Sequence, residues 1–328
     1  MYKFIAIGDA LIDTHVQIDD ASVECNIDGK SCKLCMDFAK KIPITNSFQA
    51  IGGNGANVAT GTAKLGLKTA IVASLGKDAN GDLILSELKK NKVDTDYISF
   101  DTRAKSRYSI VLNYQGERTI LSFHQKMNYV WPKNFPATDF IYYTGLSEGF
   151  EPLQDKLISF LTKHPSVKLA MNPGSYQMKH APDKVLEAIA KSDILIVNLE
   201  EAEEILKTTI KKEKTIEALI HKLLMKGAKE VAITDAAKGA WAGNADEVWH
   251  MPSFPVEVVA KTGAGDAFSS GYTSARCLGH DIHEALAWGI ANSCAIIGNH
   301  GAQIGLLDQN GVKKMRNKYS TIKPKQII

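Results

Sequence analysis

Short apolar runs alternate with helical stretches through most of this chain, and this alternation limits the possible folds more than any other feature. The apolar runs cover residues 71–73, 140–143, 169–171, 194–197 and 231–233, and the helical stretches cover 80–91, 153–163, 183–190, 200–206 and 215–226. Such alternation predicts an α/β protein with a mostly parallel sheet and helices on both faces. Ligands of such proteins bind beyond the carboxyl ends of the strands. The residues at those ends are polar here, for example Thr144, Asn172, Asn198 and Thr234.

Two segments, approximately 11–50 and 97–124, depart from this alternation and are more strand-like. In the second, two β-rich runs flank Gln115-Gly116, which predicts a β-hairpin. Both segments leave and rejoin the α/β core. We therefore predict one domain over residues 1–328, with a small β-rich lid inserted in it that excludes water from a site below. The stretch 21–41 is longer than a compact lid needs, and we interpret it as an insertion of unknown purpose.

The segment Lys261-Thr262-Gly263-Ala264-Gly265-Asp266 combines a turn of small residues with an acid at the start of a predicted helix. Unpaired backbone N–H groups and the helix dipole make such a turn suitable for a phosphate or a developing oxyanion. A carboxylate beside an anion site is useful if it takes a proton from a hydroxyl that then attacks the phosphate. The alternative is an ordinary loop in which Asp266 caps the helix.

A second glycine-rich segment, Gly52-Gly53-Asn54-Gly55-Ala56-Asn57, opens an alanine-rich helical stretch. It lacks the third glycine and the following acid of the dinucleotide-binding fingerprint, so a dehydrogenase is not indicated. Paired glycines with two amides suit close approach to a small polar ligand with many hydroxyls. The alternative is that Asn54 caps the helix, with Gly55 and Ala56 selected for tight packing.

Together these two segments resemble the signatures of the ribokinase-like, or PfkB, family of carbohydrate kinases, and Asn198-Leu199-Glu200-Glu201 resembles a third. The resemblance covers essentially the whole chain. It implies a three-layer α/β/α core with a β-rich lid, and an ATP-dependent transfer of the γ-phosphate to a hydroxyl of a sugar or nucleoside. Two alternatives are a sugar-phosphate kinase and a non-catalytic sugar or nucleotide sensor on the same fold.

The resemblance also implies roles for individual residues. Asp266 would be the catalytic base, and Gly263, Ala264 and Gly265 would hold the phosphate through their backbone N–H groups. The acceptor would contact Asp13, Gly53 and Asn57, and Asp9 would either join them or cap its own turn. The nucleotide would contact Asn198, Thr234, Asp235, Gly239 and Asn292, and Glu201 would organise Mg²⁺ through water. Relatives that are activated by K⁺ usually have an acid where this chain has Ala260, so K⁺ activation is doubtful.

Arg107 lies in the predicted lid, where sugar-phosphate kinases of the resembling family bind the acceptor's phosphate with arginines. A guanidinium suits that bidentate task. The alternative, which we favour, is that Arg103, Lys105 and Arg107 share one solvent-facing side of a strand.

The composition is that of an ordinary globular protein, with 45% hydrophobic and 23% charged residues. A net charge of +3 is too small to indicate binding to nucleic acid or a membrane. The chain shows no signal peptide and no long apolar run, so we expect a cytoplasmic protein, and the family's use of its lid suggests a homodimer. Cys32 and Cys35 have a zinc-ligand spacing, but no second ligand pair follows, so we expect reduced thiols, including Cys25.

Overall fold

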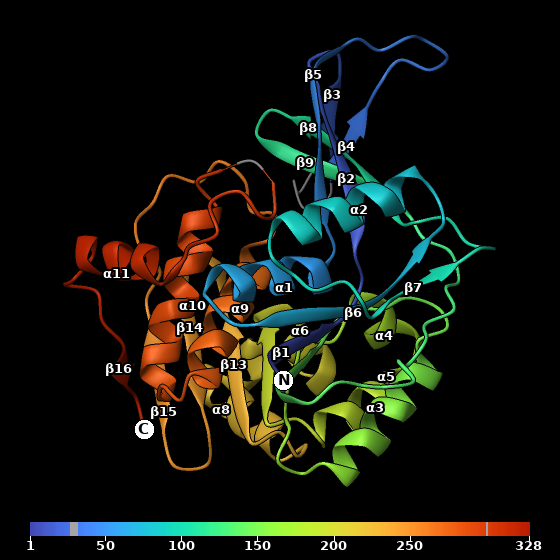
Figure 1. Ribbon diagram of the computed structural model, residues 1–328. Coiled ribbons are helices and arrows are strands. Elements are labelled where there is room, and N and C mark those ends of the chain that lie inside the picture. Colours follow the sequence, from blue (N-terminus) through green and yellow to red (C-terminus); the bar gives the residue numbers. More distant parts are fainter. Residues whose placement is uncertain (27–31, 300) are drawn as a thin grey trace.

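A long twisted sheet forms the centre of the protein (Figure 1). The computed structural model describes residues 1–26, 32–299 and 301–328. Within them the large sheet runs in the order β16 (Lys325–Gln326), β15 (Val248–Met251), β14 (Ala240–Gly243), β13 (Glu230–Thr234), β12 (Ile194–Asn198), β11 (Lys168–Met171), β10 (Thr138–Tyr143), β1 (Tyr2–Ile7), β6 (Thr69–Gly76), β7 (Ile98–Asp101). Strands β13 to β7 pair in parallel, and β14 to β16 add antiparallel pairs at one edge. All five predicted strands are present.

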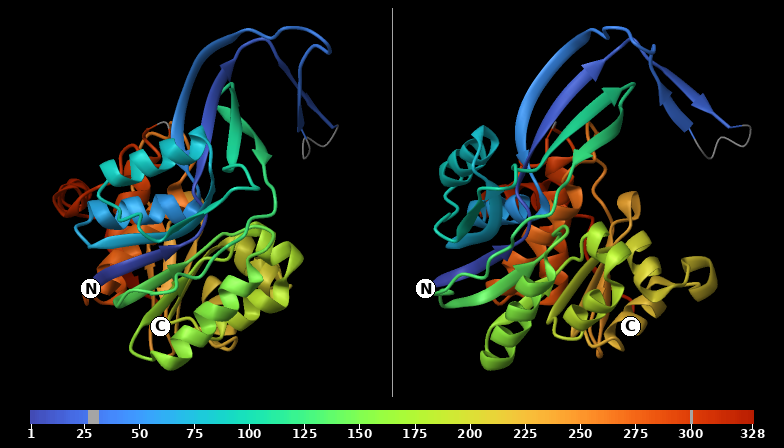
Figure 2. Two further views of the ribbon diagram at one scale, coloured as in Figure 1. Left: turned by 45° about the vertical axis from the view of Figure 1, so that its right-hand side comes forward. Right: turned by 90° about the vertical axis from the view of Figure 1, so that its right-hand side faces the viewer.

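Helices cover both faces of this sheet, as Figure 2 shows, so the predicted three-layer α/β/α architecture is confirmed. One layer holds α1 (Asn54–Lys64), α2 (Ala79–Lys90), α9 (Ala264–Cys277), α10 (Ile282–Ile296) and α11 (Gln309–Lys318). The other holds α3 (Glu151–Lys163), α4 (Ser175–His180), α5 (Pro182–Ile189), α6 (Leu199–Leu206), α7 (Ile210–Glu213) and α8 (Ile216–Leu224). In β1, Phe4 and Ala6 point into the first layer, and Ile5 and Ile7 into the second. Both sides of a central strand are therefore buried, which explains its continuous apolar run.

A smaller sheet projects from one end of the core (Figures 1 and 2) and corresponds to the predicted lid. Its order is β5 (Ile44–Gly52), β2 (Leu11–Ile18), β8 (Tyr108–Tyr114), β9 (Glu117–Phe123). The predicted hairpin joins β8 to β9 through Gln115 and Gly116, both with positive φ, as a tight hairpin turn requires. The second segment is shorter than predicted. Its first part forms β7 in the large sheet, and its contribution to the lid begins at Tyr108.

The stretch 21–41 carries a separate hairpin, β3 (Ser22–Cys25) and β4 (Cys32–Cys35), beyond the lid. A disulfide joins Cys25 to Cys32 across the two strands. The expectation of reduced thiols is therefore wrong for these two residues, which stand at paired positions of one hairpin, and holds for Cys35, which is free. Among the described residues no group of three or more potential metal-ligating side chains occurs.

None of the helices within the described ranges has the length and apolar character needed to cross a membrane.

Candidate active site

The turn that precedes α9 forms one wall of the candidate site. Gly263 is the N-cap of α9 with φ 77°, and a Cβ there would lie 2.8 Å from the Cα of Ala302, so only glycine fits without strain. Within the described part of the chain, the backbone N–H groups of Gly263, Gly265 and Asp266 donate to no protein acceptor. Gly265 is exposed, and nothing lies within 4 Å of a Cβ built on it. The turn therefore offers free donors at a positive helix end, as the sequence predicts for an anion site.

Asp266 lies in the first turn of α9 and does not cap it. Its Oδ1 accepts a hydrogen bond from Asn54 Nδ2 (2.9 Å), and its Oδ2 accepts one from Asn57 Nδ2 (2.8 Å). Asn57 is in turn held by Gln303, whose Nε2 donates to Asn57 Oδ1 (3.0 Å). Burial raises the pKa of Asp266 to about 6, the two amides oppose that rise, and the charge of Asp13 adds to it. The result is an oriented carboxylate that accepts a proton near neutral pH.

The backbone packs closely at the start of α1. Gly53, not Asn54, is the N-cap, with φ 93° and no side-chain cap. A Cβ on Gly53 would lie 2.5 Å from Asp9 O, and one on Gly55 would lie 2.6 Å from Gly8 C. The tight packing proposed for Gly55 is confirmed, whereas the capping role suggested for Asn54 is wrong because its amide faces Asp266.

A cavity of about 190 Å³ lies beside Asp266, and residues at the ends of β12 and β13 line it. Besides Asp266 and the turn, it is lined by Asn198, Glu201, Asn172 and Thr234. Asn198 and Glu201 form a reciprocal capping box, in which Glu201 N donates to Asn198 Oδ1 (2.8 Å) and Asn198 N donates to Glu201 Oε2 (3.0 Å). Asn172 Nδ2 also donates to Glu201 Oε2 (3.1 Å). Burial raises the pKa of Glu201, and the charge of Asp266 adds to this effect.

Asp13 approaches the same region from the lid strand β2. The position of a Cβ on Gly52 would overlap the Asp13 carboxylate, so glycine at that position makes room for it. Burial raises the pKa of Asp13, opposed by a hydrogen bond from Ser109 and by the charge of Arg118. Arg118, on β9, also contacts Thr262 in the turn before Asp266. The lid therefore reaches the turn before α9 through Arg118, which the sequence did not single out as a site residue.

Arg107 does not face solvent, and our expectation of an exposed strand side is wrong for it. The side chain is 10% exposed and forms an ion pair with Asp9, which is also buried. Asp9 additionally accepts a hydrogen bond from Tyr129 OH (2.8 Å), and Arg107 contacts His124. The strand begins only at Tyr108, so the alternation that placed Arg107 with Arg103 does not extend that far back; Arg103 is 84% exposed.

The remaining predicted nucleotide residues lie apart from this cavity. Asp235 forms an ion pair with Lys238 (2.8 Å), and Gly239 closes the same turn with φ 94°. Asn292 is fully buried, donates to Ala267 O and Ser270 Oγ (both 2.9 Å), and accepts from Leu307 N (2.9 Å). The amide nitrogen makes two hydrogen bonds and the amide oxygen accepts one, so Asn292 connects α9, α10 and the following loop.

The covered parallel sheet, the lid and an oriented acid beside an anion-binding turn define a small-molecule phosphotransferase. The family model for pfkB family carbohydrate kinases matches residues 21–309, and the chain therefore belongs to this family. Ribokinase of Bacillus subtilis is 28% identical over 280 residues, which cover 82% of this chain and 89% of that protein. ATP-dependent 6-phosphofructokinase of Thermoanaerobacterium thermosaccharolyticum is 26% identical over 280 residues, covering 80% and 84%.

A solved structure with the same fold is that of Arabidopsis thaliana ribokinase complexed with ribose and ATP. It matches with a TM-score of 0.78 and 20% identity, covering 96% of this chain and 98% of that one. The protein is thus an ATP-using carbohydrate kinase, and the sensor alternative is not supported.

Proposed function

We propose that Asp266 is the catalytic base that deprotonates a primary hydroxyl of the acceptor in line with the γ-phosphate of ATP. One observation carries this proposal: the carboxylate is held by Asn54 and Asn57 beside a turn with free backbone N–H groups. A proton acceptor and an anion cradle at one helix start are what phosphoryl transfer to an alcohol requires. A pKa of about 6 leaves most of the carboxyl deprotonated at neutral pH.

The residues present fit a magnesium ion that is bound together with the nucleotide. Mg²⁺ keeps several waters and uses one or two carboxylates plus phosphate oxygens, so a dedicated cluster of three acids is not needed. Apart from Asp266, Glu201 provides the carboxylate in the lining of this cavity. Its Oε1 accepts no hydrogen bond from any described residue. Bound there, the metal would neutralise charge that develops on the phosphates. Asn198 and Asn172 keep the carboxylate oriented.

We infer that the acceptor is a neutral sugar or nucleoside. Asp13 provides a carboxylate that can accept hydrogen bonds from two neighbouring hydroxyls. Arg107, which would have served a phosphorylated acceptor, is paired with Asp9 in a buried site. A cation that is already compensated offers little to a second anion. Gly53 packs against the backbone of Asp9 beside the acceptor site, and Asn57 orients the Asp266 carboxylate there.

A coupled ADP-release assay against pentoses, hexoses, nucleosides and the matching sugar phosphates tests this function. We expect turnover with a neutral acceptor, at least about tenfold higher in kcat/KM than with its phosphorylated form. A strong preference for a sugar phosphate would replace the neutral-acceptor proposal with the sugar-phosphate kinase. No turnover with any of these acceptors, despite measurable binding, would contradict the proposed phosphotransfer to a sugar or nucleoside.

The lid also supports a homodimer. Large apolar side chains are exposed on it, on the neighbouring hairpin and on the segment that joins them, among them Val23, Ile44, Ile120, Leu121 and, in the joining segment, Phe38. Exposed apolar groups on one projecting element are typical of an interface. Sedimentation analysis at several concentrations tests this, and a monomer at all of them would contradict it. We propose a cytoplasmic location because ATP is the phosphate donor, although the Cys25–Cys32 disulfide is more typical of oxidising compartments.

A further inference from the structure

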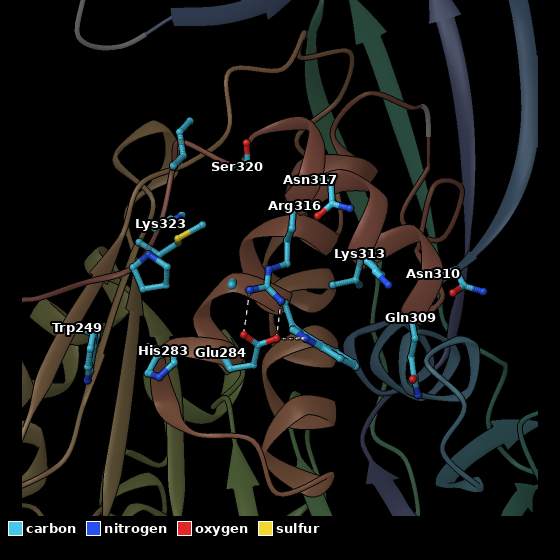
Figure 3. Close-up of a pocket in the computed structure, with 16 residues that line it drawn as sticks. Trp249, His283, Glu284, Gln309, Asn310, Lys313, Arg316, Asn317, Ser320 and Lys323 are labelled. Carbon is cyan, nitrogen blue, oxygen red and sulfur yellow. Dashed lines mark hydrogen bonds and ion pairs between the residues drawn. The ribbon is translucent and has the colours of Figure 1, made fainter.

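A second cavity, shown in Figure 3, lies beside the first half of α10. It is bounded by β15, the first half of α10, α11 and residues 320–324, and its volume is about 830 Å³. None of its lining residues lines the cavity beside Asp266. A volume of this size suits a small organic ligand. Neither the proposed catalysis nor the family's acceptor and nucleotide segments make use of it.

Two tryptophans give the cavity aromatic walls. Trp288 is 7% exposed, and its Nε1 donates to Glu284 Oε1 (3.0 Å), which fixes the indole. Trp249 is half-buried, stands next to the ring of His283 at 4.9 Å between centroids, and donates from Nε1 to Glu247 (2.7 Å). Fixed indoles are suitable surfaces for a planar ring, because little conformational freedom is lost when the ring packs on them.

The charged groups of the cavity are predominantly cationic. Glu284 is the acid of the lining, and Arg316 on α11 binds both of its carboxylate oxygens, as the dashed lines in Figure 3 show. Lys313 and Lys323 also line the cavity, and neither forms an ion pair with any residue in the described ranges. Two uncompensated ammonium groups remain after the one carboxylate is neutralised. The cavity therefore complements an anion.

We propose that this cavity is a second ligand site, which binds a nucleotide through its planar base and its phosphate. The base packs against Trp249 or Trp288, and the uncompensated charges of Lys313 and Lys323 attract the phosphate. Exposed polar side chains from α11, such as Asn317, provide hydrogen bonds for the sugar. The site is distinct from the ATP site of the catalytic reaction, so the proposal does not depend on the proposed function.

Calorimetric titration of the full chain with AMP tests the proposal. The variant carries Lys313→Glu and Lys323→Glu, and the matched control carries Lys314→Glu and Lys325→Glu. The control residues are exposed neighbours on the same two segments that do not line the cavity. We expect AMP to bind the wild type and the control equally, and to bind the cavity variant at least about tenfold more weakly. The KM for ATP is expected to be the same in all three proteins.

Two further ligands separate the chemistry of base and phosphate. Adenosine lacks the phosphate and is expected to distinguish the cavity variant from the control by less than about threefold. Ribose 5-phosphate lacks the base and is expected to bind the wild type at least about tenfold more weakly than AMP. Equal AMP affinity in the two variants would assign AMP to the catalytic cleft and overturn the proposal. Absence of AMP binding at millimolar concentration would also overturn it. Equal affinity of the wild type for ribose 5-phosphate and for AMP would overturn the nucleotide class, because phosphate alone would then account for binding.

Discussion

Replacing Asp266 by asparagine removes the proposed base while keeping its shape. The new amide would face the Nδ2 donors of Asn54 and Asn57, and it can accept from only one of them. Asn57 cannot turn without losing its bond from Gln303, whereas no hydrogen bond to Asn54 Oδ1 is present among the described residues, so Asn54 can reverse its amide. We therefore expect the free energy of unfolding to change by about 1 kcal/mol, the scale of one ordinary hydrogen bond.

The expected loss in kcat is roughly 10²- to 10⁴-fold, the usual contribution of a positioned base. Since each factor of ten corresponds to about 1.4 kcal/mol, this is ~3–5 kcal/mol of transition-state free energy. ATP affinity should remain nearly unchanged, because the backbone N–H groups of the turn are not altered. Stopped-flow or coupled ADP-release kinetics measures the first quantity, and calorimetry with ATP measures the second.

The pH dependence provides a second arm of the same experiment. A base must be deprotonated to act, so activity should fall as the pH decreases through the pKa of Asp266, about 6. Asp82→Asn is the matched control, because Asp82 lies in the first turn of α2, outside the site. It should leave both rate and profile unchanged. Near-normal turnover of Asp266→Asn would refute this assignment. So would residual activity of that variant that decreases at low pH in the same way as the activity of the wild type.

Three other substitutions test the surroundings. Asp13→Ala should weaken acceptor binding by about 1.5–3 kcal/mol, the scale of hydrogen bonds to a charged group, and leave ATP binding intact in calorimetry. Arg107→Ala leaves the Asp9 carboxylate buried and unpaired, so urea titration should show a loss of about 3–5 kcal/mol, with Arg103→Ala as a near-neutral exposed control. Arg118→Ala breaks the contact between lid and catalytic turn, and kcat/KM for the acceptor should fall about tenfold in steady-state kinetics while thermal stability is retained.

The core of the fold was predictable because its signals are local. Parallel strands that are buried on both faces require uninterrupted apolar runs, and the runs at 140–143 and 194–197 lie within β10 and β12. The edge strands β14 to β16 carry no such run. Trp241 and His250 stack against each other there, and the pairing depends on antiparallel neighbours that the periodicity does not specify.

The two hairpins show which features of the small sheets could be predicted from the sequence and which could not. The pair Gln115-Gly116 between two β-rich runs was enough to predict β8 and β9, because the turn chemistry is contained in the turn. The disulfide between Cys25 and Cys32 was missed, although the two residues face each other across β3 and β4. Cysteine spacing alone does not distinguish a bonded pair from two free thiols, because the pairing of β3 with β4 brings the two residues together.

Charge pairing between distant segments explains why the acceptor site was only partly predictable. Asp9 follows β1 and Arg107 precedes β8, and nothing in either local sequence shows that each is the other's partner. When each residue is considered separately, the sequence predicts that Asp9 binds hydroxyls and that Arg107 either binds a phosphate or lies on the surface. Joined in one buried pair, they cancel each other's charge, so our proposal assigns the acceptor to Asp13. The chemistry inferred for the acceptor thus follows from a pairing that only the folded chain creates: a neutral polyol satisfies Asp13, whereas a phosphate would meet no free partner in Arg107.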